Sequence, residues 1–155
     1  MSTEPVVRDA TAADLDKLVG YEIQIARISF PANPIVDPQS HRGRIDKALD
    51  DPREGTFVAV PATNPDEVVG WTWVSIRENF LTGEQYANLR SVAVDDGPDS
   101  TAVAQALVQH AERFASGRGV TEIVGRVHVR NVPMRVVYRS LGFEAEHLTM
   151  RKMFS

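Results

Sequence analysis

The sequence predicts an α/β protein whose mixed, mostly antiparallel central sheet is flanked by helices. An amphipathic segment at 100–116 predicts a long helix, and strand-like segments at 56–60 and 67–77 predict an antiparallel hairpin. Helical and strand-like segments follow the order β-α-α-β-β-β-α-β-α-β-β, which is typical of helices packed on a shared sheet. With 155 residues, the chain has the length of a single domain, 1–155, with one sizeable core.

Two helices are predicted after a short first strand at 6–8. Thr11 is an N-cap residue, and apolar residues follow it at helical spacing until Pro31, which ends the helix. Asp37-Pro38 is a second start signal, because aspartate caps a helix and proline fits its first turn. The second helix is polar and is expected to end near Leu49.

Three strands joined by polar turns are expected next. A turn at 61–66 that contains Pro, Asn and Asp connects the hairpin strands at 56–60 and 67–77. The following strand is expected at 86–94. Its last four residues, 91–94, show little alternation of polar and apolar residues, as expected for a strand covered on both faces.

The C-terminal part of the chain combines a helix start, a strand and a second helix. Glycines end the helix at 100–116, and a strand at 121–129 and a short helix at 133–141 are expected after it. This short helix carries the phenol of Tyr138. Residues 144–153 have room for two short strands or one bent strand.

The composition argues against several classes of protein. The formal net charge of -4 argues against a nucleic-acid-binding surface, and the chain has no cysteine for a disulfide, a thiolate zinc site or a nucleophile. His41, His110 and His147 lack the spacing of a metal site. The N-terminal segment has no apolar signal-peptide core, and no apolar run reaches membrane-spanning length. These features predict a cytoplasmic protein without a metal, nucleic-acid or membrane partner.

The start of the helix at 100–116 is suited to an anion. The first N–H groups of a helix have no intrahelical acceptor, and the helix dipole favours negative charge there. Small side chains let a phosphate approach the backbone, and Ser100, Thr101, Ala102 and Ala104 are small. These residues are also ordinary cap residues and helix formers, so a phosphate site and a purely structural helix start both fit the pattern.

Two longer motifs include and follow this helix start. The first is Asp99-Ser100-Thr101-Ala102-Val103-Ala104, with Leu107 three residues later, and the second is Asn131, Tyr138 and Leu141-Gly142-Phe143. Together with the N-terminal VVRDATAADLDKL, they resemble the signatures of the Gcn5-related N-acetyltransferase (GNAT) family. The resemblance spans nearly the whole chain, and the second motif is its most specific part.

The resemblance implies the acyl-CoA N-acyltransferase fold, with acetyl-CoA as co-substrate. It implies that the pantetheine arm bonds to the backbone of Val92, Ala93 and Val94, where the fourth and fifth strands splay apart. It implies a pyrophosphate site formed by Asp99, Ser100, Thr101, Ala102, Val103 and Ala104. Asn131 is implied as a cofactor contact, and Tyr138 as the residue that protonates the departing thiolate.

The sequence departs from the family pattern at the loop before the helix. The usual Arg or Gln is Asp99 here, and the usual glycine three residues later is Ala102. Asp95 and Asp96 add two more acids near the expected pyrophosphate, where like charge lowers affinity unless solvent screens it. The sequence therefore predicts a cofactor site with an unusually acidic loop.

The motifs do not fix the residue that takes the proton from the amine. The glutamate that the family often has on its fifth strand aligns with Arg126. His128 on the same strand is the catalytic candidate, with Glu78 and Glu84 as alternatives. A packing or surface role also fits each of these three residues.

The function that follows is an acetyl-CoA-dependent N-acetyltransferase acting on a primary amine. Direct transfer is expected because no cysteine can carry the acetyl group. A small-molecule acceptor is favoured over a protein amine. If the family fold holds, the acceptor site lies at the first two helices, where Arg42, Arg44 and Lys47 would flank it, and at the loop 79–84. A solvated helix face also fits these three cations.

Two other functions fit the same sequence. A non-catalytic acetyl-CoA- or ligand-binding module of the same fold would bind without turnover. A structural subunit would dimerise through an exposed face that carries Trp71 and Trp73. The resemblance also implies a homodimer as the common state of such proteins.

Overall fold

The computed structural model describes residues 4–32 and 34–154. Within them, a five-stranded sheet has the order β1-β2-β3-β4-β5, antiparallel except for the parallel pair β4 and β5. The strands are β1 (Val6–Asp9), β2 (Glu54–Val60), β3 (Gly70–Glu78), β4 (Gln85–Val94) and β5 (Ile123–Gly125). The helices are α1 (Leu15–Ser29), α2 (Pro38–Leu49), α3 (Ser100–Ser116) and α4 (Val132–Ser140), with a short 3-10 helix, η1 (Ala12–Asp14), before α1. This arrangement confirms the predicted fold class.

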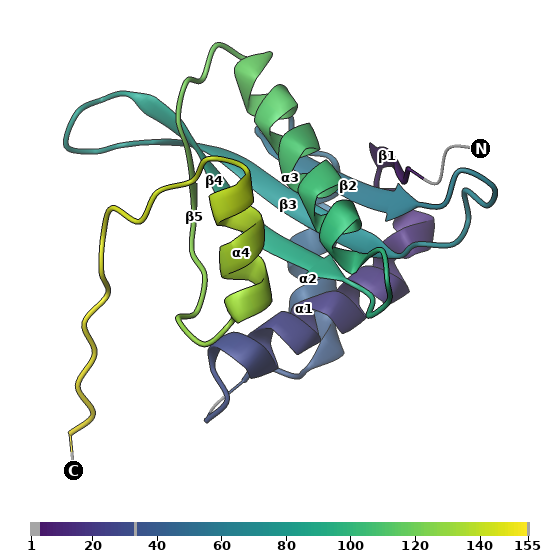
Figure 1. Cartoon of the computed structure of the whole chain (residues 1–155), viewed down its shortest axis with the longest axis horizontal. Helices are drawn as coiled ribbons and strands as arrows, with labels where there is room; N and C mark the ends of the chain where they lie inside the picture. Colours follow the sequence, from purple (N-terminus) through teal and green to yellow (C-terminus); the bar gives the residue numbers. More distant parts are fainter. Residues whose placement is uncertain (1–3, 33, 155) are drawn as a thin grey trace.

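Helices cover both faces of the sheet (Figure 1). On one face, Leu18 of α1 and Ile45 of α2 are fully buried against Trp71 of β3 in the α1–α2 core. On the other face, Val108 of α3 and Val137 of α4 are buried with sheet residues in the α3–α4 core. The buried stripe of α3 falls at the helical spacing that the sequence predicts.

Helix starts lie where the sequence places their caps. The Asp14 carboxylate accepts the Thr11 N–H at 2.8 Å, which closes the turn before α1. The Asp37 carboxylate accepts the Gln39 N–H at 3.2 Å, and Pro38 follows at the first helical position of α2. Both helices therefore begin within a few residues of their predicted starts.

A β-bulge changes the face that β4 buries. Leu89 lies in the α3–α4 core, whereas Ala93 lies in the α1–α2 core. Arg90 is the extra residue, because Ser91 and Leu89 pair with the consecutive residues Trp73-Val74 of β3. Past the bulge, Val92 and Val94 are half-buried against the α3 side of the sheet, while Ala93 is buried on the α1–α2 side. Both faces of 91–94 are therefore covered, as predicted.

The fifth strand is shorter than predicted. β5 covers Ile123–Gly125 instead of 121–129, and its last partner on β4 is Leu89. Arg90 follows Leu89, and a bulge bends and twists its strand, which ends regular pairing on that side. Residues 126–131 therefore leave the sheet and lead into α4.

Two further expectations are wrong. Residues 144–153 form no strand, and the chain after α4 extends away from the body of the molecule (Figure 1). Trp71 and Trp73 are 0% and 2% exposed, so they do not form an exposed face for a dimer. The helices α1 and α2 cover both indoles, which the sequence alone does not reveal.

Candidate active site

The candidate active site begins where β4 and β5 part. The last parallel pair joins Leu89 to Gly125, and residues 90–94 continue β4 without a β5 partner among the described residues. Backbone N–H and C=O groups on such an edge are open to a ligand. The three residues expected to bond the pantetheine arm, Val92, Ala93 and Val94, all lie on this open edge.

The open edge leads through residues 95–99 to the start of α3. No side chain caps α3, whereas Asp37 caps α2 and Asn131 caps α4. Thr101-Ala102 is exposed in the first turn, and Val103-Ala104 is buried, so only backbone groups of the latter pair can face a ligand. An uncapped start of a 17-residue helix is suited to an anionic group.

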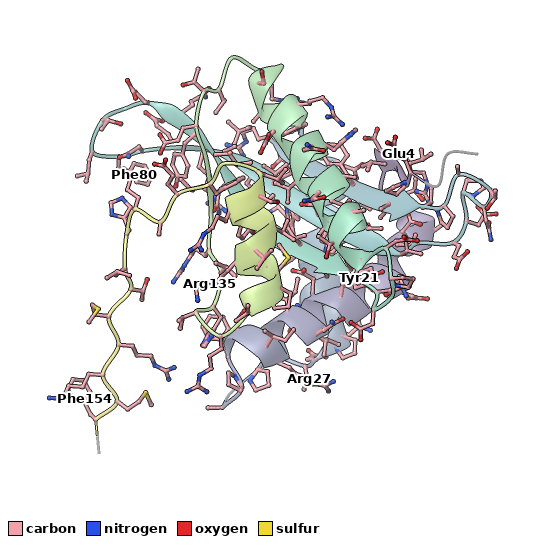
Figure 2. All side chains as sticks on the ribbon, in the orientation of Figure 1. Glu4, Tyr21, Arg27, Phe80, Arg135 and Phe154 are labelled. Atoms are coloured by element: carbon pink, nitrogen blue, oxygen red, sulfur yellow. The ribbon has the colours of Figure 1, made fainter. Side chains whose placement is uncertain are left out.

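One of the three acids in the loop is neutralised by α1. The Asp95 carboxylate accepts hydrogen bonds from Lys17 Nζ at 3.0 Å and from the Tyr21 hydroxyl at 2.9 Å. Burial, reinforced by Asp95, raises the pKa of Tyr21, so its hydroxyl stays protonated and keeps donating. Figure 2 shows Tyr21 beside the β4–α3 connection. Asp96 and Asp99 are both exposed, so solvent screens these two acids.

Tyr138 points from α4 toward the end of β5. Its side chain is buried, with its ring centre 4.9 Å from that of Phe143, and it packs on Gly125, the last residue of β5. The phenol oxygen has no hydrogen-bond partner among the described residues. Burial raises the pKa of Tyr138 to about 12, so the phenol carries its proton at neutral pH. A protonated phenol therefore lies at the point where the sheet opens.

A tight turn holds His128 and Asn131 before α4. The Asn131 N–H donates to the His128 carbonyl at 2.8 Å, and the Asn131 side-chain oxygen accepts the Met134 N–H at 3.4 Å. The Arg130 N–H donates to His128 Nδ1 at 3.1 Å. In this arrangement Nδ1 is occupied, the neutral ring carries its proton on Nε2, and the amide nitrogen of Asn131 remains open to a ligand.

A polar cluster on the α1–α2 face lies next to the bulge, and the sequence motifs gave no sign of it. The guanidinium carbon of Arg90 lies 3.8 Å from the ring centre of Trp73, and its Nη1 lies 3.7 Å from Glu54 Oε1. The other oxygen of Glu54 accepts from Trp73 Nε1 at 3.1 Å and from the Ser75 hydroxyl. The sequence shows the Trp-x-Trp spacing but not the register of β2 and β3 that brings Glu54 beside Trp73.

Further charges surround this cluster. The Trp71 indole donates to Glu22 of α1 at 3.2 Å, and both groups are buried. Burial lowers the pKa of Arg90; Glu54 opposes this shift, and the positive charges of Arg77 and Arg44 add to it. The guanidinium carbon of Arg44 lies 5.9 Å from the Trp73 ring centre. Arg44 therefore faces the polar cluster.

Other features lie away from the opening of the sheet. Glu78 and Glu84, the alternative proton acceptors, are exposed at the β3–β4 hairpin. Two hollows of about 430 Å³ lie elsewhere, one lined by Glu54, Phe57 and Phe114, the other by Val7, Gln105 and His110. The described residues contain no cluster of three His, Asp or Glu side chains placed to hold a metal ion. They include no helix long and apolar enough to span a membrane.

This geometry defines a class of protein. A parallel strand pair that opens at a bulge, followed by an uncapped helix start and a buried tyrosine, is the arrangement expected of acyl-CoA-dependent acyltransferases. The acetyltransferase (GNAT) family model matches residues 23–143, and the chain belongs to this family. GNAT acetyltransferases use acetyl-CoA as their acetyl donor.

Solved structures share the fold. Aminoglycoside N-acetyltransferase AAC(6')-Iy in complex with CoA is 19% identical, with 99% of this chain and 97% of that chain covered and a TM-score of 0.77. A putative acetyl transferase from Pyrococcus furiosus is 23% identical, with 97% and 100% covered and a TM-score of 0.76. At these identities the comparisons establish the fold alone.

A curated relative matches part of the chain. Mycothiol acetyltransferase of Kocuria rhizophila is 28% identical over 98 residues, which make up 63% of this chain and 32% of the relative. The chain thus spans about a third of that relative's length. The relative's acceptor cannot be transferred from such an overlap.

Proposed function

We propose that the chain is a single acetyl-CoA-dependent N-acetyltransferase domain that acetylates a primary amine of a small molecule by direct transfer. The observation that carries this proposal is the opening of β4 from β5 after the Leu89–Gly125 pair, with the start of α3 beyond it. Acetyl-CoA would supply an activated acetyl thioester at this opening. The named neighbours that acetylate small molecules support the choice of acceptor class.

The chain's own groups fit such a co-substrate. The stretch Val92, Ala93 and Val94 suits the amides of a pantetheine arm, because alternate residues of the strand present backbone groups to its open edge. At the start of α3 the Ser100 N–H donates to the Gly97 carbonyl at 3.2 Å, so the N–H groups of Thr101 and Ala102 suit a pyrophosphate. At about 3.3 Å per strand residue, the five residues 90–94 span roughly the length of such an arm. Asn131 Nδ2 is a further side-chain donor that no described residue uses, and it would suit the same co-substrate.

Tyr138 and His128 are the proposed proton carriers. Tyr138 holds a proton on its phenol oxygen and would deliver it to the leaving thiolate. His128 stays our candidate for accepting the proton of the amine. While Nδ1 accepts the Arg130 N–H, Nε2 of the neutral ring already carries a proton, so acceptance at Nε2 would require the tautomer protonated on Nδ1 and release of the Arg130 hydrogen bond. Backbone N–H groups at the bulge would stabilise the oxyanion of the tetrahedral intermediate.

A homodimer formed through the C-terminal segment is part of the proposal. Leu148 and Met150 are 85% and 86% exposed, and two residues apart in an extended segment they share one side. Figure 2 shows Phe154 at the far end of this segment, away from the body of the molecule. β5 ends the sheet and leaves an edge for a strand from a second copy, which would cover these side chains. Location in the cytoplasm stays a prediction.

Two measurements test the function. Calorimetric titration with acetyl-CoA is expected to show saturable binding, and an amine screen that follows CoA release is expected to find turnover. Absence of binding at millimolar acetyl-CoA would exclude the proposed enzyme. Binding without turnover on any amine of a broad panel would instead favour a non-catalytic ligand-binding module.

A further inference from the structure

Arg90 has donors that the protein does not use. Its side chain is 26% exposed, and its single ion pair, to Glu54, is long at 3.7 Å. No hydrogen bond to the guanidinium is formed among the described residues. Glu54 already accepts two hydrogen bonds on its other oxygen, from Trp73 and Ser75. A guanidinium presents five N–H donors, so Arg90 is an incompletely satisfied cation that lies over an indole ring.

Arg90 lies on the side of the sheet from which the acceptor amine would approach. It is the bulge residue, directly after the last β4–β5 pair, and it faces the α1–α2 side of the sheet. An acetyl group at the opening of the sheet would therefore lie beside Arg90. An amine that attacks it from the α1–α2 side would pass within reach of the guanidinium.

Counting Arg90 itself, the polar cluster contains three cations, with Arg77 and Arg44, and two anions, Glu54 and Glu22. Arg77 and Arg44 are close enough to lower its pKa by repulsion, and both are exposed. The two carboxylates of the cluster, Glu54 and Glu22, are each committed to an indole N–H. A second positive charge on the acceptor would be repelled by the guanidinium groups. An anionic group would instead accept hydrogen bonds from the N–H groups of Arg90 that the protein leaves unused.

We propose that the acceptor amine carries an anionic oxygen group, a carboxylate or a phosphate, which Arg90 binds with support from Arg77 and Arg44. This inference rests on the proposed function and narrows its substrate class. A planar guanidinium pairs with carboxylate or phosphate through two parallel hydrogen bonds, which would fix the direction from which the amine arrives. Polyamines are correspondingly poor acceptors.

Anion binding tests the proposal directly. The full chain is saturated with CoA, which fills the anion site at α3, and is then titrated with inorganic phosphate or acetate in a calorimeter. Saturable binding of at least one of the two anions is expected, weakened about tenfold or more by Arg90→Gln and less by Arg90→Lys. Arg113→Gln, on α3 at the other face of the sheet, is the matched control and leaves the affinity unchanged. Absence of saturable binding, or equal binding in Arg90→Gln, overturns the proposal.

Acceptor pairs provide the second arm. Glycine is compared with glycinamide, and phosphoethanolamine with ethanolamine, for acetyl transfer by the wild type and by Arg77→Gln, an exposed change that leaves the core intact. The anionic member is expected to be the better acceptor, and the pair that shows the preference identifies carboxylate or phosphate. Preference for the members that lack the anionic group, or for spermidine, overturns the proposal. If CoA does not bind, the proposed function fails, and the phosphate titration of the unliganded chain with and without Arg90→Gln still decides the anion site.

Discussion

Gly125 and Tyr138 pack against each other at the point where the sheet opens, and any larger residue at position 125 would crowd the phenol. A Cβ at position 125 would lie 3.1 Å from the Tyr138 phenol oxygen and 3.2 Å from Cζ. Real Cβ contacts are rarely this short. The end of β5 therefore fixes the position of the phenol that we propose as the proton donor.

Gly125→Ala tests this contact. The added methyl is expected to push Tyr138 away, which costs about 1–3 kcal/mol of unfolding free energy and lowers kcat by on the order of tenfold or more. Urea unfolding and the rate of CoA release measure the two effects. Gly20→Ala is the matched control: the helical site has no atom within 4 Å of an added Cβ, so stability should rise by about 0.5–1 kcal/mol. An unchanged kcat in Gly125→Ala would contradict the assignment.

Tyr138→Phe separates binding from proton transfer. Removal of the hydroxyl is expected to lower kcat by about 100-fold to 10,000-fold while the acetyl-CoA Kd stays the same. Steady-state kinetics and calorimetry provide the two values. Tyr86→Phe removes a phenol of β4 that has no hydrogen bond within the described chain, and it should keep wild-type kinetics. A Tyr138→Phe enzyme with full activity would rule out the proposed proton donor.

The raised pKa of Tyr138 predicts an alkaline loss of stability. The phenol ionises at 10.0 in the unfolded chain and at about 12 in the folded protein. The unfolded state therefore loses its proton first, and the contribution to stability, complete below pH 10, falls by about 1.4 kcal/mol per pH unit up to pH 12. Urea unfolding of the wild type and of Tyr138→Phe across this range measures the difference. Parallel stability curves for the two proteins would refute the assignment of this pKa.

Asp99 is expected to weaken cofactor binding modestly. It is exposed beside the uncapped start of α3, so Asp99→Asn should strengthen acetyl-CoA binding by about twofold to fivefold at low salt. At about 1 M salt the difference should disappear, because screening removes exposed charge interactions. Asp46→Asn, exposed on α2, controls for net charge. Weaker binding by Asp99→Asn would show that the carboxylate has a structural role in the loop.

The C-terminal segment predicts the oligomeric state. If Leu148 and Met150 join a second copy at the edge of β5, the wild type sediments as a dimer, and Leu148→Lys with Met150→Lys shifts it to a monomer. Thr149→Lys places one lysine on the other side of an extended segment and should leave the dimer intact. Sedimentation velocity distinguishes these states. A wild type that is monomeric at all concentrations would disprove this assembly.

The local features of the chain could be predicted from sequence because their causes are local. The extent of α3 follows from periodicity over 100–116, and the starts of α1 and α2 follow from their capping residues. The Asn131-to-Phe143 motif was found for the same reason, since its Asn cap, Tyr138 and the closing Gly142 all lie on one short helix and its ends.

The features that could not be predicted depend on strand register and on contacts between distant segments. Glu54 reaches Trp73 only because β2 pairs with β3 in one register, and Arg90 is recognised as a bulge residue only once Ser91 is paired with Trp73. The sequence shows three acids in the loop before α3, where they would repel a phosphate. It does not show that Lys17, 78 residues before Asp95, pairs with that carboxylate. Residues 144–153 alternate like a strand, but they pair with no strand among the described residues. Alternation does not reveal whether a sheet edge is available for pairing.

The bulge at Arg90 also leaves the pairing of β4 with β3 independent of this residue. Leu89 pairs with Val74 and Ser91 pairs with Trp73, so the two neighbours of Arg90 already have consecutive partners on β3. Deletion of Arg90 would therefore convert the bulge into a regular ladder and leave Ala93 facing α1 and Val92 and Val94 facing α3. The sheet could form with a strand one residue shorter. The residue that its pairing does not require is the one that carries unused guanidinium donors where the sheet opens.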